Sequence, residues 1–135
     1  MSMDIDAPSL PFFIPKVYEG LAKANGIARI SPAGLTLEFQ VKDSFVGMLT
    51  SEVREVHISI DDLLHLELRK GWFKTRLVIR TRRMAAVNMI PGNHVGGIEL
   101  GVTRQDRKIA ETLVSILALS RSERELENLE NGRGG

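Results

Sequence analysis

The sequence has no cysteine among its 135 residues, few aromatic side chains and no long hydrophobic run. Without cysteine the chain can form no disulfide, no cysteine metal site and no thiol nucleophile, which fits a reducing compartment. No segment approaches the roughly 20 apolar residues that span a bilayer, and the first residues are acidic, unlike a secretory signal. We therefore expect a cytoplasmic protein with one domain and no transmembrane segment, because 43% hydrophobic composition suffices for one core.

The net charge is also small, at +1. A chain with this balance is a poor candidate for nonspecific attraction to nucleic acid or to an anionic membrane by the whole molecule. The positive charge is local, because residues 69–83 contain seven Lys or Arg and no acid, whereas residues 1–68 contain five against ten acids. The basic character therefore belongs to one short segment.

Three short runs within residues 52–83 alternate apolar with polar side chains, which is the period of strands that bury one face. Asp61-Asp62 separates the first two runs. It is interpreted as a turn and not as a catalytic or metal-binding pair, because adjacent strand residues point to opposite faces and Asp is a common turn residue. The second and third runs supply five predicted core residues: Leu64, Leu66, Leu68, Leu77 and Ile79.

Residues 70–71 lie between the second and third runs and predict a hairpin. A register that keeps the apolar side chains on one face sets Leu68 opposite Phe73 and Glu67 opposite Lys74. Glu67 is then expected to neutralise Lys74.

The opening segment, residues 7–15, has three prolines around a compact apolar group. Proline lacks a backbone donor and restricts its neighbours, so we expect an extended arm over residues 1–16 and neither a helix nor a central strand. Apolar side chains left in water would form an exposed patch, so the arm should dock either on its own domain or on a neighbouring subunit. It supplies three candidate self-association residues: Leu10, Phe12 and Phe13.

Further strands are predicted on both sides of the hairpin, in residues 17–31, 35–41, 84–90 and 98–102. Asn25-Gly26 lies inside the first of these, where short alanine-rich flanks favour a bulge or bend over a turn. Pro32 and Gly34 occupy the second and fourth positions of a type I turn ahead of the next strand.

The hydrophobic period changes after residue 102, and a helix is predicted. Thr103 is a favourable N-cap, and Asp106 three residues later suits the positive end of the helix dipole. The helix carries an apolar stripe made of Ile109, Ala110, Leu113, Val114, Ile116 and Leu117. Beyond the stripe the sequence is mostly charged, and we expect the helix to persist to about Glu130. Leu126 and Leu129 on this extension complete the candidate self-association residues.

This order of strands and one C-terminal helix resembles the pleckstrin-homology-like (PH-like) superfold, including GRAM and bacterial PH-like domains. The segments that carry the resemblance are residues 34–37, 56–63, 71–73, 77–79 and 98–100, with Ala110, Leu113 and Leu117 in the helix. The resemblance covers residues 17–119. It implies a mainly β fold, with a barrel of about seven antiparallel strands capped by the helix, and leaves residues 120–135 as a helix extension and flexible tail.

Two departures from the family pattern bear on function. The tryptophan of the family commonly lies in the terminal helix, whereas Trp72 lies at a hairpin. Phosphoinositide-binding members carry a basic motif between their first two strands, and here only Arg29 is near that loop. No phosphoinositide site is therefore carried over to this chain.

The outward face of the hairpin offers a candidate binding surface of Arg69, Trp72, Lys74, Arg76, Arg80 and Arg82. Cations at strand spacing could contact an acidic protein, another subunit, phosphates or lipid head groups, and they could equally be a solvated edge that charge protects from aggregation. Trp72 could stack on Arg69, anchor a partner or simply pack over the hairpin end.

Signals for chemistry are sparse. The three histidines lack metal-binding spacing, no nucleophile-elbow, dinucleotide or P-loop motif is present, and the glycine-rich residues 91–97 lead into a strand, so anion binding there is a minor possibility. We hypothesise a non-enzymatic binding or scaffolding module without a cofactor, which acts through protein contacts including copies of itself. The alternatives are a peripheral module for anionic lipid, and a small enzyme or ligand carrier that uses a barrel cavity.

Overall fold

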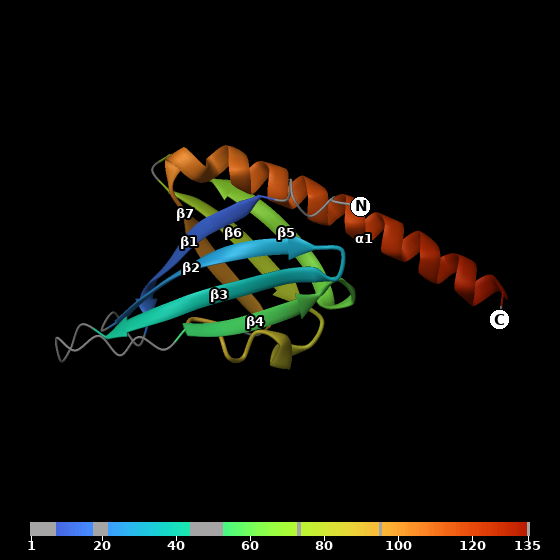
Figure 1. Cartoon of the computed structure of the whole chain (residues 1–135), viewed down its shortest axis with the longest axis horizontal. Helices are drawn as coiled ribbons and strands as arrows, with labels where there is room; N and C mark the ends of the chain where they lie inside the picture. Colours follow the sequence, from blue (N-terminus) through green and yellow to red (C-terminus); the bar gives the residue numbers. More distant parts are fainter. Residues whose placement is uncertain (1–7, 18–21, 44–52, 73, 95, 135) are drawn as a thin grey trace.

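The computed structural model describes residues 8–17, 22–43, 53–72, 74–94 and 96–134 (Figure 1). Seven strands and one long helix make up this part of the chain. The strands are β1 (Ser9–Val17), β2 (Ala22–Ser31), β3 (Gly34–Asp43), β4 (Val53–Ser59), β5 (Leu63–Lys70), β6 (Thr75–Thr81) and β7 (Gly97–Val102), and the helix is α1 (Arg107–Gly134). Three 3-10 turns complete it: η2 (Ile60–Asp62), η3 (Met84–Ala86) and η4 (Arg104–Asp106).

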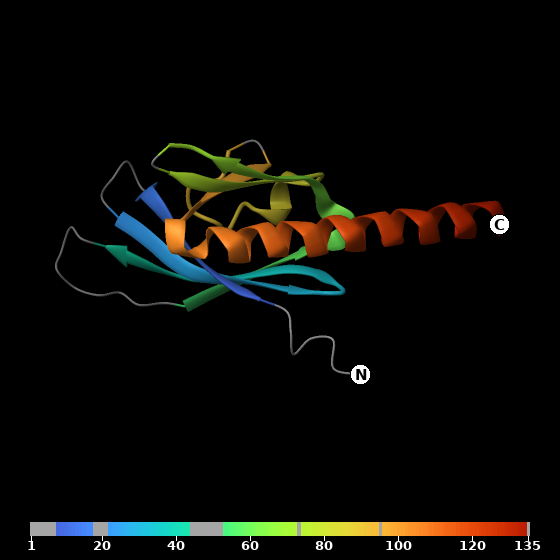
Figure 2. The same cartoon turned by 90° about the horizontal axis from the view of Figure 1, so that it is seen from above.

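All neighbouring strands pair antiparallel in one sheet of order β4-β3-β2-β1-β7-β6-β5. The sheet curls so that β1 to β4 and β5 to β7 form two layers, and α1 runs along the opening between them (Figure 2). Among the described residues, β1 and β7 have one registered pair, Phe13 with Gly101. The expected mainly β fold of seven antiparallel strands with a capping helix is confirmed.

The core fills the space between the two layers, as the alternation in the sequence predicts. Leu35 and Leu37 of β3 are fully buried, as are Leu77 and Ile79 of β6. The first half of α1 closes this core with three buried side chains: Ala110, Leu113 and Leu117. Burying a leucine contributes about 1.5–3 kcal/mol, so the helix's near half is a substantial part of the fold's stability.

The Pro-rich segment differs from the prediction, because β1 is a central strand of the sheet and not an extended arm. It pairs with β2 from Ser9 to Ile14, and its bonding to β7 is limited to one residue pair. The two prolines inside β1 therefore cost little, since one side of the strand makes almost no ladder and needs few donors. Leu10 and Phe12 alternate into the core of their own chain, 0% and 4% exposed.

The β5–β6 hairpin is real, but its register differs from the predicted one by four residues. Leu68 pairs with Leu77 and Glu67 with Val78, and Lys70–Thr75 is the last pair before the turn. A shift by an even number keeps every side chain on its face, so the alternation alone could not locate the turn.

An irregularity at the start of β5 moves one predicted core residue to the surface. The pairing with β6 shifts between Leu63 and His65, so Leu63 takes the core position at 1% exposure while Leu64 is 49% exposed. Leu66 and Leu68 are partly buried against the core.

The predicted strand over residues 84–90 is wrong. This stretch forms η3 followed by turns, with Val87 N–H donating to Met84 O at 3.2 Å and Ile90 N–H to Val87 O at 3.0 Å. Val87 and Ile90 enter the core while Met84 and Met89 are more than 60% exposed. The spacing of three between the buried residues is that of a tight helical turn, which a nearly all-apolar segment does not reveal by alternation.

Two glycine positions were predicted with different success. The Ser31–Gly34 turn is confirmed, because these residues form the last pair of the β2–β3 hairpin and Gly34 has a φ of 144°. No bulge occurs at Asn25-Gly26, where pairing with β3 is unbroken. A Cβ on Gly26 would lie 2.7 Å from Phe39 Cβ and 2.8 Å from Phe12 Cζ, so this glycine serves close packing.

The terminal helix begins close to its predicted N-cap and continues beyond its predicted end. Thr103 precedes the 3-10 turn η4, its hydroxyl donates to Asp106 Oδ2 at 3.0 Å, and α1 follows directly. The helix extends to Gly134 and not only to about Glu130.

Candidate binding surfaces

The outer face of β5, β6 and β7 carries a network of alternating charges. Glu67 on β5 accepts from His65 at 3.2 Å and from Arg69 at 3.4 Å. Glu99 on β7 pairs with Arg69 at 3.7 Å and with Arg76 at 3.6 Å. The hydrogen bond from His65, followed by the charge of Arg69, lowers the pKa of Glu67. Two of the six predicted binding-surface residues, Arg69 and Arg76, are thus engaged by carboxylates of their own sheet.

Three cations of the predicted strip are exposed and make no ion pair within the described chain: Lys74, Arg80 and Arg82. The expected pairing of Glu67 with Lys74 is wrong, because the shifted register puts Val78 opposite Glu67. Val78 is itself 4% exposed although it faces outward, between Glu67 and Glu99 in the register. The strip is therefore interrupted by an apolar residue and a neutralised arginine.

The tip of the β5–β6 hairpin is fastened to the beginning of α1. Arg104 Nη2 donates to the Trp72 carbonyl at 3.4 Å, and Lys70 forms an ion pair with Glu111, which lowers the pKa of Glu111. The indole of Trp72 is 85% exposed, so the hairpin end does not cover it. We call Trp72, Lys74 and Arg104 the head patch; Lys74 and Arg104 have no carboxylate partner among the described residues.

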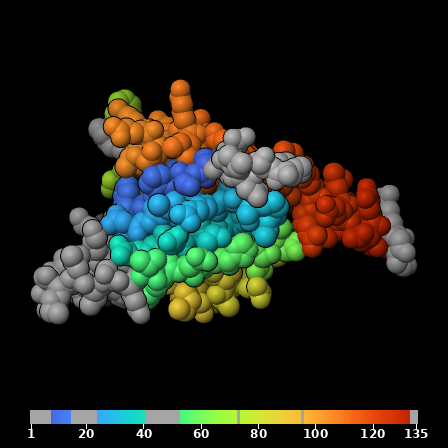
Figure 3. Space-filling model, in the orientation of Figure 1, coloured from blue at the N-terminus to red at the C-terminus, as the bar shows by residue number. Residues whose placement is uncertain are grey.

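The second half of α1 leaves the sheet. Leu117 is the last fully buried residue of the helix, and every residue from 122 to 132 is exposed. Two arginines make the last hydrogen bonds from the described helix to the rest of the domain: Arg121 Nη2 donates to Leu64 O at 3.1 Å, and Arg124 donates to both Asp61 oxygens at 3.0 and 3.2 Å. Beyond them the helix stands clear of the strands (Figures 1 and 3).

The free half of α1 carries an exposed stripe of leucines. Leu126 and Leu129, both predicted as self-association residues, are 60% and 61% exposed. Leu119, which the sequence reasoning missed, is 62% exposed and lies two helical turns before Leu126 on the same face. It is two positions after buried Leu117, about 200° around the helix, so the stripe faces away from the core. We call Leu119, Leu126 and Leu129 the tail stripe. The seven-residue spacing between Leu119 and Leu126 was the sequence signal that could have identified Leu119.

The other self-association candidates are less available. Leu10 and Phe12 are buried in the core of the same chain, so they are corrected as contact residues. Phe13 points to the opposite face of β1 and is 37% exposed, and its ring lies over Gly101 of β7. Of these three candidates, Phe13 is therefore the one that retains surface for a partner.

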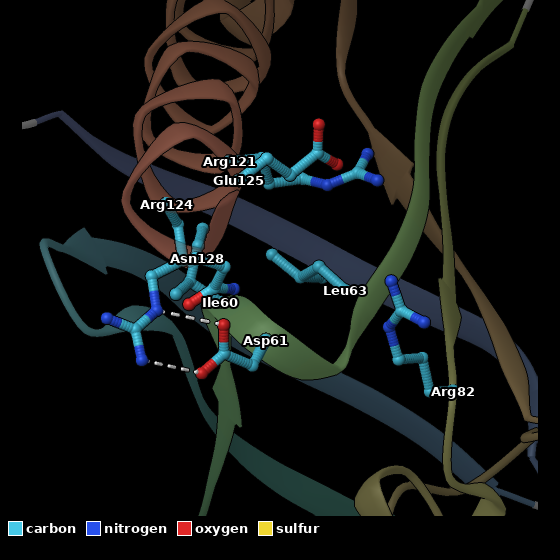
Figure 4. A pocket seen from close by; sticks show the side chains of 8 residues that line it. All are labelled: Ile60, Asp61, Leu63, Arg82, Arg121, Arg124, Glu125 and Asn128. Atoms are coloured by element: carbon cyan, nitrogen blue, oxygen red, sulfur yellow. Dashed lines mark hydrogen bonds and ion pairs between the residues drawn. The ribbon is translucent and has the colours of Figure 1, made fainter. Parts of the chain in front are cut away.

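A pocket of about 190 Å³ lies where α1 crosses η2 and the ends of β5 and β6 (Figure 4). Its lining comprises Ile60, Asp61, Leu63, Arg82, Arg121, Arg124, Glu125 and Asn128. Three guanidinium groups against two carboxylates leave a small positive excess, and Arg124 is already bound to Asp61 (Figure 4). We call this crossing of α1 over η2 the joint, because Arg121 and Arg124 hold the helix to the rest of the domain there.

The adjacent aspartates at this joint have separate structural roles. The Ser59 hydroxyl accepts from Asp61 N–H at 3.3 Å, and both aspartates lie in the 3-10 turn η2, which confirms the turn interpretation. Asp62 accepts from Arg83 at 2.6 and 3.0 Å, and this hydrogen bonding lowers its pKa despite partial burial. Each carboxylate binds a different arginine, so they do not form a paired acid–base site.

The described residues contain neither a metal-binding cluster nor a helix that could span a membrane. No three His, Asp or Glu side chains gather there as a metal ion requires. No helix in that part of the chain is long and apolar enough to cross a membrane. Comparison with known proteins is equally sparse: no protein family, no curated protein and no solved structure matches the chain.

Proposed function

We propose that this protein is a non-enzymatic binding module with a PH-like fold, which acts through protein contacts and associates with copies of itself. The strand meander closed by a terminal helix is the arrangement that the family resemblance implies, and it supports the assignment. About half of the charged side chains that the structure describes are engaged in ion pairs within the domain. The surfaces left over are suited to binding and not to proton transfer.

One observation carries the proposal: the free half of α1 presents the tail stripe to solvent. An isolated helical segment of about this length is marginal in water, and its stability in proteins comes from packing of an apolar face. Residues 122–132 receive no such packing from their own domain. A second copy of the chain is the partner available wherever the protein is made, and it would bury leucines that the monomer leaves about 60% exposed.

The size of this surface predicts weak association. Residues 120–134 extend for about 22 Å, and one helix face of that length covers a few hundred Å². Stable protein interfaces bury about 800 Å² on each partner. We therefore expect dissociation constants in the range of tens to hundreds of micromolar, with assembly that depends on concentration.

Light scattering coupled to size exclusion tests the proposal over a range from about 10 to 500 micromolar, which brackets that affinity. The mass should rise with concentration for the natural chain, and the rise should disappear for the double variant Leu126→Gln/Leu129→Gln. Glutamine is a good helix former, so the helix should persist in circular dichroism. Met89→Gln is the matched control, because Met89 is equally exposed at 61% but lies outside α1, in the turns that follow η3. A natural chain that stays monomeric throughout would refute self-association.

A second candidate function is weak binding of anionic lipid surfaces. The exposed cations Lys74, Arg80 and Arg82 favour it, because none of them forms an ion pair within the described chain. Sedimentation with vesicles of phosphatidylserine at low salt should then capture the protein, and changing these three residues to Glu should prevent capture. Equal binding to neutral phosphatidylcholine vesicles, or none to either, would exclude this function.

A further inference from the structure

The two candidate surfaces lie at opposite ends of the molecule. The head patch includes Arg104 of η4, which immediately precedes α1, whereas Leu126 and Leu129 lie near the helix's other end. A helix of 28 residues is about 42 Å long. Figures 1 and 2 show that the first half crosses the sheet while the second projects past it. The molecule is therefore elongated, with different chemistry at each end.

Within residues 119–132, the charged side chains that lie beside the tail stripe are acids. Glu123 and Glu130 lie on one side of the leucines and Glu125 on the other, and all three are exposed without an ion pair in the described chain. The two arginines nearby, Arg121 and Arg124, are turned toward their own domain by Leu64 O and Asp61. If two tails paired through their leucines, glutamates would face glutamates at the positions that normally carry opposite charges. Symmetric tail-to-tail pairing is disfavoured.

The head patch has the complementary chemistry. Trp72 offers a large exposed apolar side chain, and aromatic residues are the usual anchors of protein interfaces. Lys74 and Arg104 flank it with positive charge. An apolar stripe bordered by carboxylates fits an indole bordered by cations, because both the apolar and the charged parts find partners.

We propose that copies of this chain associate head to tail, with the tail stripe of one copy bound to the head patch of another. This inference rests on the proposed self-association and specifies its contact. The interface joins two different surfaces, so each copy has one donor end and one acceptor end. Added salt weakens it, because its charged rim is exposed to solvent.

Complementation between two variants tests the contact. A head variant, Trp72→Ser/Lys74→Glu, keeps an intact tail, and the tail variant Leu126→Gln/Leu129→Gln keeps an intact head. Each alone should associate at least about 10-fold more weakly than the natural chain, as expected when an anchor is removed. An equimolar mixture should regain the natural affinity and yield a 1:1 pair in light scattering, because one intact junction remains. The substituted side chains are exposed, so both variants should fold, which circular dichroism checks.

The outcomes separate this inference from the proposed function. A natural chain that is monomeric defeats both. If the natural chain associates and the head variant associates equally well, self-association stands and the head-to-tail contact is wrong. If both variants lose association but their mixture does not regain it, one symmetric interface contains both surfaces and the inference is also wrong.

Discussion

Two glycines at close contacts allow a direct test of how the sheet is held together. Gly26 of β2 lies under Phe12 and Phe39 and against the Glu38 carbonyl, whereas Gly101 of β7 lies under the ring of Phe13. A Cβ on Gly101 would lie 2.5 Å from Phe13 Cζ. The first glycine contacts core side chains and backbone, and the second contacts one half-exposed ring. Gly→Ala should therefore have different consequences at the two positions.

The expected loss of stability at each glycine depends on whether the atoms that contact the new Cβ can move away. At Gly26 a neighbouring strand would have to shift, and overpacking of this kind costs about 1–3 kcal/mol. For a chain of this size the melting temperature should fall by about 3–10 °C. At Gly101 the Phe13 ring can swing outward, so Gly101→Ala should cost only about 1 kcal/mol, the packing that the ring gives up.

Urea unfolding of five variants measures these effects, with Phe13→Ala as the background. In that background Gly101→Ala should become neutral or stabilise by about 0.5 kcal/mol, because alanine loses less chain entropy than glycine. Gly26→Ala should cost the same with or without Phe13, since that ring is not among its nearest contacts. Additive behaviour of Phe13 and Gly101, or a Gly26→Ala variant as stable as the natural chain, would refute this account of β1.

Two further predictions concern the helix and the joint beneath it. Leu117→Ala should lower the free energy of unfolding by about 2–5 kcal/mol, while Leu119→Ala two residues later should change it by less than about 0.5, and urea titration distinguishes the fully buried side chain from the exposed one. The Arg83 hydrogen bond lowers the pKa of Asp62 in the folded state, so this carboxylate contributes stability above its unfolded pKa that is lost as pH falls through the folded value. The stability difference between the natural chain and Asp62→Asn should therefore shrink on acidification, and a difference that grows at low pH would contradict the ion pair.

Local signals predicted the elements that depend on local geometry. The Pro32 and Gly34 positions located the β2–β3 turn, and the alternation around Leu37 fixed the buried face of β3. The apolar stripe of α1 likewise identified the residues that close the core. In each case, the relevant physical constraint acts within one turn or between residues two to four positions apart.

Features that depend on distant partners could not be predicted. The three prolines argued against a central strand. β1 is nevertheless central, because the described residues form almost no ladder of hydrogen bonds between β1 and β7. The ion pairs of the charged strip could not be predicted for the same reason, since Arg76 contacts Glu99 only because β7 pairs with β6. A four-residue shift of the hairpin leaves every face unchanged, so only the actual turn fixes which residues are opposite.

The division of α1 into two halves connects these findings to function. The near half closes the core, and Arg124 bound to Asp61 of η2 is the last ion pair between the described helix and the rest of the domain. A helix required only as a cap could end at that point, yet the chain continues as regular helix to Gly134. The continuation keeps leucines on the solvent face, where they add nothing to the fold of the single copy. The physical account of this second half therefore lies in what it contacts outside its own domain, and the complementation experiment identifies whether that contact is the head patch of another copy.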